Sequence, residues 1–214
     1  YMKLIDKNAY ERNKEAVHNE NKYVFNCMNT DKICIFTDTG KMHTIKAVDI
    51  PLGRFRDKGT PVDNLSNYDS SQERMLYVAP VGQLRSDRLL FVTKTSMCKL
   101  VEGAEFDVAK RTIASTKLAD EDELIFIGSA SEMEQIVLQS HGGCFLRFLT
   151  QEVSTMKKTA LGVRGMKLAD DDYLEHAYLL AGHQEYTISY HDKEYALNKV
   201  RLAKRDTKGI KPRI

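Results

Sequence analysis

The feature that most constrains the fold of this chain is a repeat of about fifty residues. Four short apolar runs occupy residues 23–27, 75–79, 124–127 and 173–177. With Phe25, Leu76, Ile125 and Leu174 taken as equivalent, the steps between runs are 51, 49 and 49 residues. Self-similarity at such a period is typical of a supersecondary unit that repeats and stacks on its neighbours.

Each repeat has the composition of antiparallel β-strands. A second run follows the first at 33–37, 89–93, 136–139 and 186–190, and after a tight turn comes a third at 42–46, 97–101, 144–148 and 195–197. The runs are rich in Ile, Val, Phe, Tyr and Thr, and Gly, Asp and Ser lie between them. This pattern is typical of β-hairpins and not of helices.

The repeats predict an all-β, propeller-like fold of four-stranded blades. We expect one sheet per repeat, with about four full repeats and partial ones at the two ends, because radial packing protects the sheet edges. Residues 1–214 are expected to form a single domain. A β-sandwich with accidentally even spacing is the alternative, and three steps that agree within two residues argue against it.

A basic segment follows the third run of every repeat. The segments are Arg54-Phe55-Arg56-Asp57-Lys58-Gly59, Lys110-Arg111, Lys157-Lys158, and Lys204-Arg205-Asp206-Thr207-Lys208-Gly209. The formal net charge of the chain is only +2, but residues 193–214 carry eight basic and two acidic residues. This asymmetry indicates a surface that faces a polyanion on a nearly neutral body. A solvated, poorly ordered chain end is the alternative for the last segment.

Sequence motifs for catalysis or cofactor binding are not found in the chain. There is no GxxxxGK[ST] or GxGxxG loop, and His141 and Cys144 have no second ligand pair nearby for a structural zinc ion. The four cysteines form no CxxC pair and are interpreted as small apolar side chains. The acidic run 170–172 is interpreted as a solvated turn. We therefore expect no cofactor, no metal and no catalysis in this domain.

The sequence also bears on the location of the protein. No signal peptide opens the chain and no apolar run is long enough to span a membrane, so we expect a cytoplasmic protein without a membrane partner. The first residue is Tyr1 rather than Met, so we expect a piece of a longer protein.

The choice among propeller families rests on residue types. The chain has no Trp, which excludes the WD40 signature, and its single Gly-Gly doublet does not fit kelch blades. Three stretches carry a resemblance: 35–41 (IFTDTGK), 48–65 (with Val48-Asp49-Ile50-Pro51 and Arg56-Asp57-Lys58-Gly59) and 160–172 (ALGVRGMKL followed by three Asp). They are similar to the repeat of the C-terminal domain, or β-pinwheel, of the bacterial type IIA topoisomerase A subunit (DNA gyrase or topoisomerase IV). The resemblance covers essentially the whole chain, although the second repeat has Ser96 where the family prefers glycine.

The resemblance implies a function in DNA handling. Domains of this family bind and wrap duplex DNA and present it to the cleavage core of an ATP-dependent type II topoisomerase. The implied partners are double-stranded DNA, the ATPase B subunit, and the remaining domains of the A subunit. The DNA-cleaving tyrosine and the metal site belong to other domains of such enzymes. The implied location is the bacterial cytoplasm, in association with the nucleoid.

Together the resemblance and the recurring basic segments predict the DNA-binding residues. Several phosphate contacts are needed, because DNA that follows a curved track must bend. The basic segments lack the interleaved aromatic side chains typical of single-strand binders, so we expect duplex binding without sequence preference. The predicted residues are Lys3, Arg12, Lys14, Arg54, Arg56, Lys58, Lys110, Arg111, Lys157, Lys158, Arg164, Lys204, Arg205 and Lys208.

One feature of gyrase is missing from the sequence. The gyrase family carries a glycine-rich basic box in the first blade, and the matching residues 10–17 contain Arg12 and Lys14 but no glycine. Without glycine this segment cannot readily adopt positive-φ conformations. The chain is therefore expected to be closer to topoisomerase IV than to gyrase. Two alternatives remain: a propeller that binds proteins and not DNA, and an enzyme built on a propeller funnel.

Overall fold

Four β-hairpins, placed where the repeat predicts them, organise the computed structural model, which describes residues 1–213. The hairpins are β1 (Lys32–Thr37) with β2 (Lys41–Lys46), β4 (Arg88–Thr93) with β5 (Met97–Glu102), β8 (Gln135–Ser140) with β9 (Phe145–Leu149), and β12 (Thr187–Tyr190) with β13 (Lys193–Ala196). All four are antiparallel, with Ile35 opposite His43 and Phe91 opposite Lys99 in the first two. The all-β prediction is confirmed.

The first three hairpin turns have one conformation in common. Gly40, Ser96 and Gly143 all have positive φ, at 77°, 73° and 80°. Serine pays a steric cost there that glycine does not. The Ser96 N–H donates to Thr93 O across the turn, and the Ser96 hydroxyl accepts from Met166 N at 2.7 Å. These bonds explain how the second repeat keeps the turn without glycine.

There is one sheet for each of the four repeats, as expected, but the first three sheets combine strands from successive repeats. The sheet orders are β3-β1-β2-β6, β10-β5-β4-β7, β11-β8-β9 and β12-β13. The added strands are β3 (Met75–Pro80), β6 (Thr112–Ala114), β7 (Leu124–Ser129), β10 (Val163–Arg164) and β11 (Leu174–Leu180). After each hairpin the chain thus returns to the second strand of the preceding hairpin before it moves on. The outer strands β6 and β10 are too short to be recognised from an apolar pattern.

The edges of the array are less complete than its first two sheets. In the third sheet, Ile210 forms an antiparallel bridge with Phe145, and Leu202 forms a parallel bridge with Arg147. At the N-terminal end, Met2 pairs with Thr60 and Leu4 with Leu52 in the same way. Four-stranded blades are thus found in two sheets, while the others have three and two strands.

One hydrophobic core lies between each pair of neighbouring sheets. Phe36, Phe91 and Phe106 meet in edge-on and stacked contacts between the first and second sheets. Leu138, Phe148 and their neighbours fill the space between the second and third. The core around the last hairpin is the smallest and relies on half-buried tyrosines such as Tyr190 and Tyr195. Burial of these apolar faces is the main source of stability in such a stack.

Short helices fill the connections. They are α1 (Lys7–Arg12), α2 (Lys14–Glu20) and α3 (Val81–Leu84), with 3-10 turns η1 (Ala47–Asp49), η2 (Val62–Asn64), η3 (Gly103–Phe106), η4 (Thr150–Glu152) and η5 (Leu197–Lys199). Asp6 caps α1 by accepting a hydrogen bond from Ala9 N. The run 23–27, expected as a strand, is not one; Tyr23 and Phe25 instead pack on the first sheet, and the Tyr23 hydroxyl donates to Leu76 O. In residues 1–22 no hairpin precedes this run, so it has no strand with which to pair.

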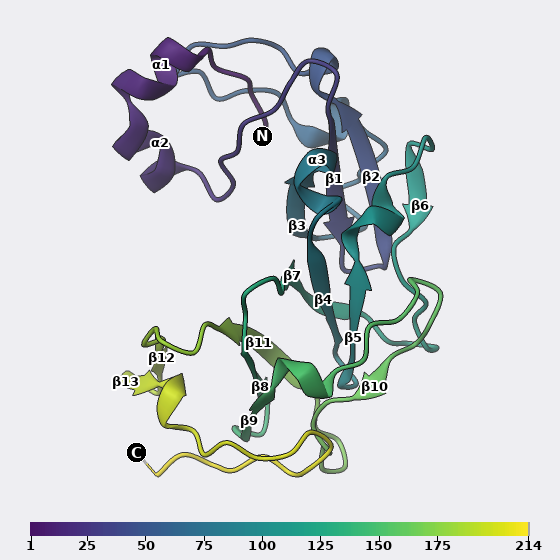
Figure 1. The fold of residues 1–214 in the computed structure, drawn as a ribbon, viewed down its shortest axis with the longest axis vertical. Helices are drawn as coiled ribbons and strands as arrows, with labels where there is room; N and C mark the ends of the chain where they lie inside the picture. The colour runs from purple at the N-terminus through teal and green to yellow at the C-terminus, as the bar shows by residue number, and fades with distance from the viewer. Residues whose placement is uncertain (214) are drawn as a thin grey trace.

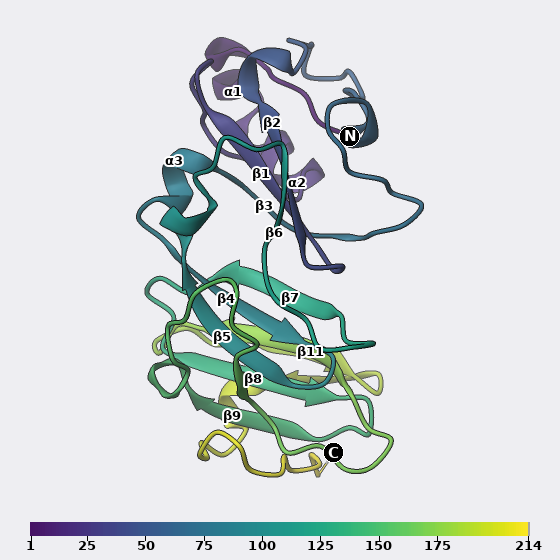
Figure 2. The ribbon, with the colours of Figure 1, turned by 90° about the vertical axis from the view of Figure 1, so that its right-hand side faces the viewer.

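The sheets follow one another around an open arc (Figure 1). The helices α1 and α2 lie at one end of the arc and the hairpin β12–β13 at the other, while β6 and β10 lie on its outer side. Turned by 90°, the sheets built on β4–β5 and β8–β9 are stacked with their strands running across the view (Figure 2). No helix within residues 1–213 is long and apolar enough to cross a membrane.

Candidate nucleic-acid interface

The predicted basic segments form four surface loops, which we call the rim loops: 53–59, 107–111, 157–162 and 203–209. Each follows a 3-10 turn and leads into a residue or strand that pairs with an earlier part of the chain. Thr60 pairs with Met2, β6 with β2, β10 with β5, and Ile210 with Phe145 of β9. Because this chain path recurs, the rim loops occupy equivalent positions beside successive sheets. The two that precede β6 and β10 lie on the outer side of the arc (Figure 1).

Seven of the predicted cations in the rim loops are exposed and have no ion-pair partner within residues 1–213. They are Arg54, Arg56, Lys58, Lys110, Arg111, Lys204 and Lys208. The Lys58 ammonium lies 4.0 Å from the centroid of the Tyr1 ring, a cation–π contact that leaves the charge exposed. The backbone of the second rim loop is fixed, since the Thr44 hydroxyl donates to Lys110 O at 3.0 Å and Thr44 N to Arg111 O. These seven side chains are the free positive charge of the rim.

A second group of predicted cations is paired with a carboxylate of the protein at its surface. Lys157 and Lys158 lie 3.4 and 3.9 Å from the carboxylate of Glu105. Burial alone would raise the pKa of Glu105, but the Lys158 N–H and the two ammonium groups hold that pKa below its ordinary value. Glu105 is therefore ionised at neutral pH and offsets the charge of this rim loop.

Two arginines fix the C-terminal rim loop to β10 and η4. Arg164 forms a two-bond ion pair with Asp206, which lowers the pKa of Asp206. Arg205 donates to Arg164 O and to Glu152 O, and its backbone N–H donates to the Glu152 carboxylate at 2.9 Å. Segment 203–209 is thus packed and hydrogen-bonded, which argues against a poorly ordered chain for these residues of the tail 193–214.

The three predicted cations nearest the N-terminus differ from the rest. Lys3 is half-buried, and its ammonium donates to Phe55 O and to Asp57 O, the latter at 2.6 Å. Arg12 is exposed at the end of α1 and donates to Asn8 O within the helix. Lys14 is exposed at the start of α2, 5.9 Å from the Tyr10 ring. The structure brings none of them into an ion pair within its described part.

Two exposed lysines that the sequence did not single out lie next to the rim. Lys117 follows β6 by the same number of residues as Lys167 follows β10, and both are exposed. The Lys117 N–H donates to Lys158 O, and the Lys167 N–H donates to Thr207 O, so each is fixed to the next rim loop. Both lysines lie four residues after a residue of an outer strand, Ile113 or Val163. This equal spacing could have indicated them, but it is recognised only when the outer strands are known.

Residues considered for metal or catalytic chemistry have structural contacts. His141 stacks on Tyr173 at 4.7 Å and bonds Glu175, while Cys144 is half-buried. Asp172 accepts hydrogen bonds from Gly142 N and Tyr173 N, so the acidic run is a turn tied to a hairpin. Within residues 1–213 there is no cluster of three or more His, Cys, Asp or Glu side chains with metal-binding geometry, and the four cysteines are free thiols.

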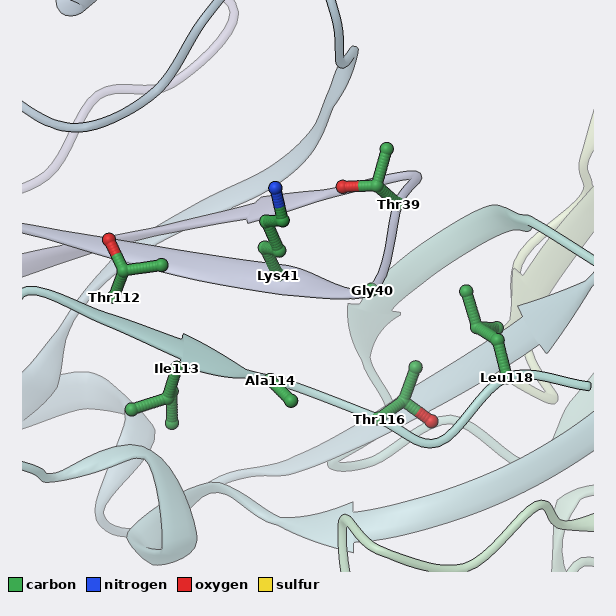
Figure 3. A pocket seen from close by; sticks show the side chains of 8 residues that line it. All are labelled: Thr39, Gly40, Lys41, Thr112, Ile113, Ala114, Thr116 and Leu118. Atoms are coloured by element: carbon green, nitrogen blue, oxygen red, sulfur yellow. The ribbon is translucent and has the colours of Figure 1, made fainter.

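One surface hollow bears on the expectation of an enzyme site. It lies between the first hairpin turn and the outer strand β6, and Figure 3 shows Lys41 as its one charged side chain among Thr39, Thr112, Ile113 and Leu118. Neither a nucleophile–base pair nor two facing carboxylates line it. This hollow gives no support to the alternative of an enzyme built on a propeller funnel.

Comparison with known proteins identifies the family. The family model described as "DNA gyrase C-terminal domain, beta-propeller" matches residues 31–70, 87–131 and 134–181, together more than half of the chain. Each matched segment contains one hairpin, beginning shortly before β1, β4 and β8. The match therefore follows the repeat described above.

Relatives and solved structures agree with this match. The DNA gyrase A subunit of Ureaplasma parvum is 27% identical over 83% of this chain and 22% of that protein, and its counterpart in Salmonella typhimurium is 31% identical over 66% of this chain and 16% of that protein. The chain thus spans less than a quarter of these relatives. Among solved structures, the C-terminal domain of DNA topoisomerase IV has a TM-score of 0.81, with 22% identity over 98% of this chain and 68% of that one. The E. coli ParC C-terminal domain has a TM-score of 0.73 over 90% of this chain and 80% of that one, with 15% identity, and supports the same fold. The chain belongs to the DNA gyrase C-terminal domain family of β-propellers.

Proposed function

We propose that this chain binds duplex DNA without sequence preference and bends it along the outer side of the arc. In this way it presents DNA to the cleavage core of an ATP-dependent type II topoisomerase. One observation carries the proposal: the rim loops recur at equivalent positions beside successive sheets, and seven of their cations are exposed and unpaired in the described structure. Positive charges that recur along an arc can contact the phosphates of a bent duplex at several points.

The physical argument rests on phosphate contacts. Duplex DNA carries a dense line of negative charge, and each neutralised phosphate releases a counterion. Smooth bending of a short duplex costs on the order of 1–6 kcal/mol, so several contacts spaced along the curve must offset it. Rim loops on consecutive sheets supply contacts at regular intervals, whereas a single basic patch would not favour a bend.

The proposal also covers the wider context of the chain. We infer a non-catalytic role without a cofactor, in the bacterial cytoplasm at the nucleoid, where the chain works with an ATPase B subunit, together with the other domains of an A subunit. The family membership and the names of the relatives support this inference. The finer assignment is to a topoisomerase IV-like domain. It is supported by residues 10–17, which lie in α1, α2 and the junction between them and contain no residue with positive φ.

One observation favours a second function, a protein-interaction module without DNA binding. Lys3, Lys157, Lys158, Arg164 and Arg205 are engaged by protein groups, so five of the fourteen predicted cations do not offer a free charge. The remaining charge is nevertheless spread along the arc, which fits an extended polyanion better than a compact partner.

A salt titration of duplex binding tests the proposal. If four to six phosphates are neutralised, the slope of log affinity against log salt concentration should be about −4 to −5. Fluorescence anisotropy with two labelled duplexes of unrelated sequence measures this slope, and both duplexes should give the same value. No measurable duplex binding at low salt, together with a captured protein partner, would favour the interaction module.

A topology assay tests the topoisomerase IV-like assignment. Relaxed circular DNA is incubated with the chain and a nicking-closing enzyme, and the linking number is then read on a gel. Because residues 10–17 are helical, we expect bent DNA with little writhe of fixed hand. A strong linking-number shift in proportion to bound protein would contradict this assignment and leave the duplex-binding proposal intact.

A further inference from the structure

Lys99 is a buried ammonium group that lies directly beneath a rim loop. It is on β5 and is only 1% exposed. Its Nζ donates to Lys158 O at 2.8 Å and to Ala160 O at 2.7 Å, and it lies 5.7 Å from the Phe91 ring. Burial lowers the pKa of Lys99 to about 8, and the charge of Glu105 opposes that shift. Because Lys99 is buried and bonded to two loop carbonyls, it is not one of the exposed charges of the rim.

The same arrangement occurs at the first rim loop. Lys3 donates to Phe55 O and Asp57 O, the carbonyls of residues two apart, just as Lys99 does. The strand pairing makes the two sites equivalent, because Met2 pairs with Thr60 as Cys98 pairs with Val163. Lys3 therefore comes one residue after Met2, as Lys99 comes one residue after Cys98. Each lysine binds the carbonyls of the residues five and three positions before the pairing partner, which is Thr60 for Met2 and Val163 for Cys98. Two independent segments of the chain thus form one local structure.

A glycine completes this structure in both loops. Gly59 and Gly162 have φ of +88° and +108°, and a Cβ at either would lie 2.7 Å from Met2 O or 2.6 Å from Cys98 O. The loop end must therefore press against the segment that carries the lysine, and only glycine allows this approach. The lysine holds the middle of the loop and the glycine its end.

The C-terminal rim loop shows what replaces the lysine. Leu146, 2% exposed, stands at the position of Lys99, since it follows Phe145 as Lys99 follows Cys98. In this loop Glu152 accepts from Arg205 N, as Glu105 accepts from Lys158 N in the third rim loop, so this bond is present with or without the lysine. A leucine at this register position is thus compatible with the fold.

We propose that Lys99 and Lys3 are positioning residues for DNA binding, which organise rim loops 157–162 and 53–59 from within and do not touch DNA. This inference rests on the proposed function. Each lysine replaces the hydration of two carbonyls by charge-assisted hydrogen bonds and so holds the loop in one conformation. A loop that is already ordered loses less conformational entropy when it binds phosphates. Lys3, which the sequence placed among the phosphate contacts, has this different role.

The test uses Lys99→Leu and Lys3→Leu, a choice that follows the natural Leu146. In the free protein, amide hydrogen exchange in 157–162 should become about tenfold faster in Lys99→Leu and stay unchanged in 53–59, with the reverse in Lys3→Leu. Duplex affinity at low salt should fall about three- to tenfold in each. The salt slope should stay unchanged, because no phosphate contact is removed. Exposed Lys204→Ala is the matched control, with a slope shallower by about 1 and unchanged exchange.

The outcomes separate this inference from the proposed function. Wild-type exchange in the loop above the substituted lysine, in a variant whose circular dichroism is native, overturns the positioning role. A slope shallower by about 1 in either variant identifies that lysine as a phosphate contact and also overturns it. If the wild-type chain binds no duplex, the proposed function fails, and the exchange measurement still decides whether the lysines order the loops. Should Lys99→Leu not fold, Lys99→Met and the half-buried Lys3 site provide the same test.

Discussion

The first and third rim loops have the same backbone support and opposite electrostatic surroundings. In 53–59 and in 157–162, a lysine beneath the loop binds two carbonyls and a glycine closes the loop end. Arg54, Arg56 and Lys58 are exposed and unpaired, whereas Lys157 and Lys158 are paired with Glu105. Asp57, the acidic residue of the first loop, accepts from Arg54 N and so caps the backbone without neutralising a side chain.

The difference teaches that shape and charge are set by separate residues in this fold. The shape depends on contacts between the loop and the strand beneath it, and these contacts are alike in the two loops. The charge depends on a residue outside the loop, because Glu105, which η3 places beside the third loop, belongs to the 3-10 turn that precedes the second loop. We therefore expect the first loop to contribute more to DNA affinity, although both present the same backbone.

The largest expected effect concerns the depth of the two lysines, since Lys99 is fully buried and Lys3 only half-buried. The folded protein releases the Lys99 proton at about pH 8, while the unfolded chain keeps it to about pH 10.5. Between these values the unfolded chain binds the additional proton, so the free energy of unfolding of the wild type rises with pH relative to Lys99→Leu. The full rise corresponds to about 3 kcal/mol. Denaturant unfolding of both proteins at neutral pH and at pH ~9.5 measures most of it.

The design of this measurement removes other titrations. Burial raises the pKa of Cys34 and Cys98 to about 12, but both thiols are present in both proteins and cancel in the difference. The groups that face the Lys99 ammonium are the two loop carbonyls, the Phe91 ring and the carboxylate of Glu105. Exposed Lys117→Leu is the control and should show no such change. A pH-independent difference for Lys99→Leu would contradict the buried-ammonium interpretation.

The next effect compares the charges of the two loops directly. Arg56→Ala with Lys58→Ala should lower duplex affinity on the order of tenfold and make the salt slope shallower by about 2, because two free phosphate contacts are lost. Lys157→Ala with Lys158→Ala should change the slope by less than about 1, since Glu105 already neutralises part of that charge. Salt titrations of the two double variants by anisotropy measure both. Equal slopes would mean that the Glu105 ion pairs open when DNA binds.

The smallest effect sharpens the comparison by making the loops alike in charge. Glu105→Gln removes the negative charge and keeps an oxygen that can accept from Lys158 N. Duplex affinity should increase about threefold, with a steeper salt slope, as the two lysines become free. Glu102→Gln, at an exposed residue at the end of β5 and outside the rim loops, is the matched control and should have a smaller effect. Weaker binding in Glu105→Gln would show that the carboxylate acts mainly by ordering the loop.

Parts of the fold could be predicted from the sequence for a simple physical reason. The two strands of a hairpin are close in sequence and appear as apolar runs on both sides of a turn. The four hairpins, their turns and the basic segments after them could therefore be located. The outer strands β6 and β10 could not, because two or three residues that pair with a distant strand leave no periodic signal. The run 23–27 has strand-like composition but no pairing partner, and composition alone cannot reveal this.

The candidate site was predictable in kind but not in detail. The periodic cations located the rim, yet the sequence does not say that Arg205 turns inward to Glu152 and Arg164, or that Lys157 meets Glu105 across more than fifty residues. Lys99 sits between apolar neighbours on β5, where strand alternation gives no reason to expect a buried charge beneath a loop. Such contacts are long-range, and the assignment of DNA-binding residues stays a prediction.

The pairing of strands across repeats has a consequence for how such a molecule can change length. The stretch of sequence that recurs and the sheet that folds are offset along the chain, because β6 completes the sheet of β1 and β2, and β10 that of β4 and β5. Suppose that a gene duplication inserts one whole repeat. The sheet of the new hairpin then receives its outer strand from the next repeat, and the outer strand of the new repeat completes the sheet of the preceding hairpin. Every junction is thus restored without a new interface. The number of repeats can therefore vary in this architecture while the interfaces between neighbouring sheets stay the same.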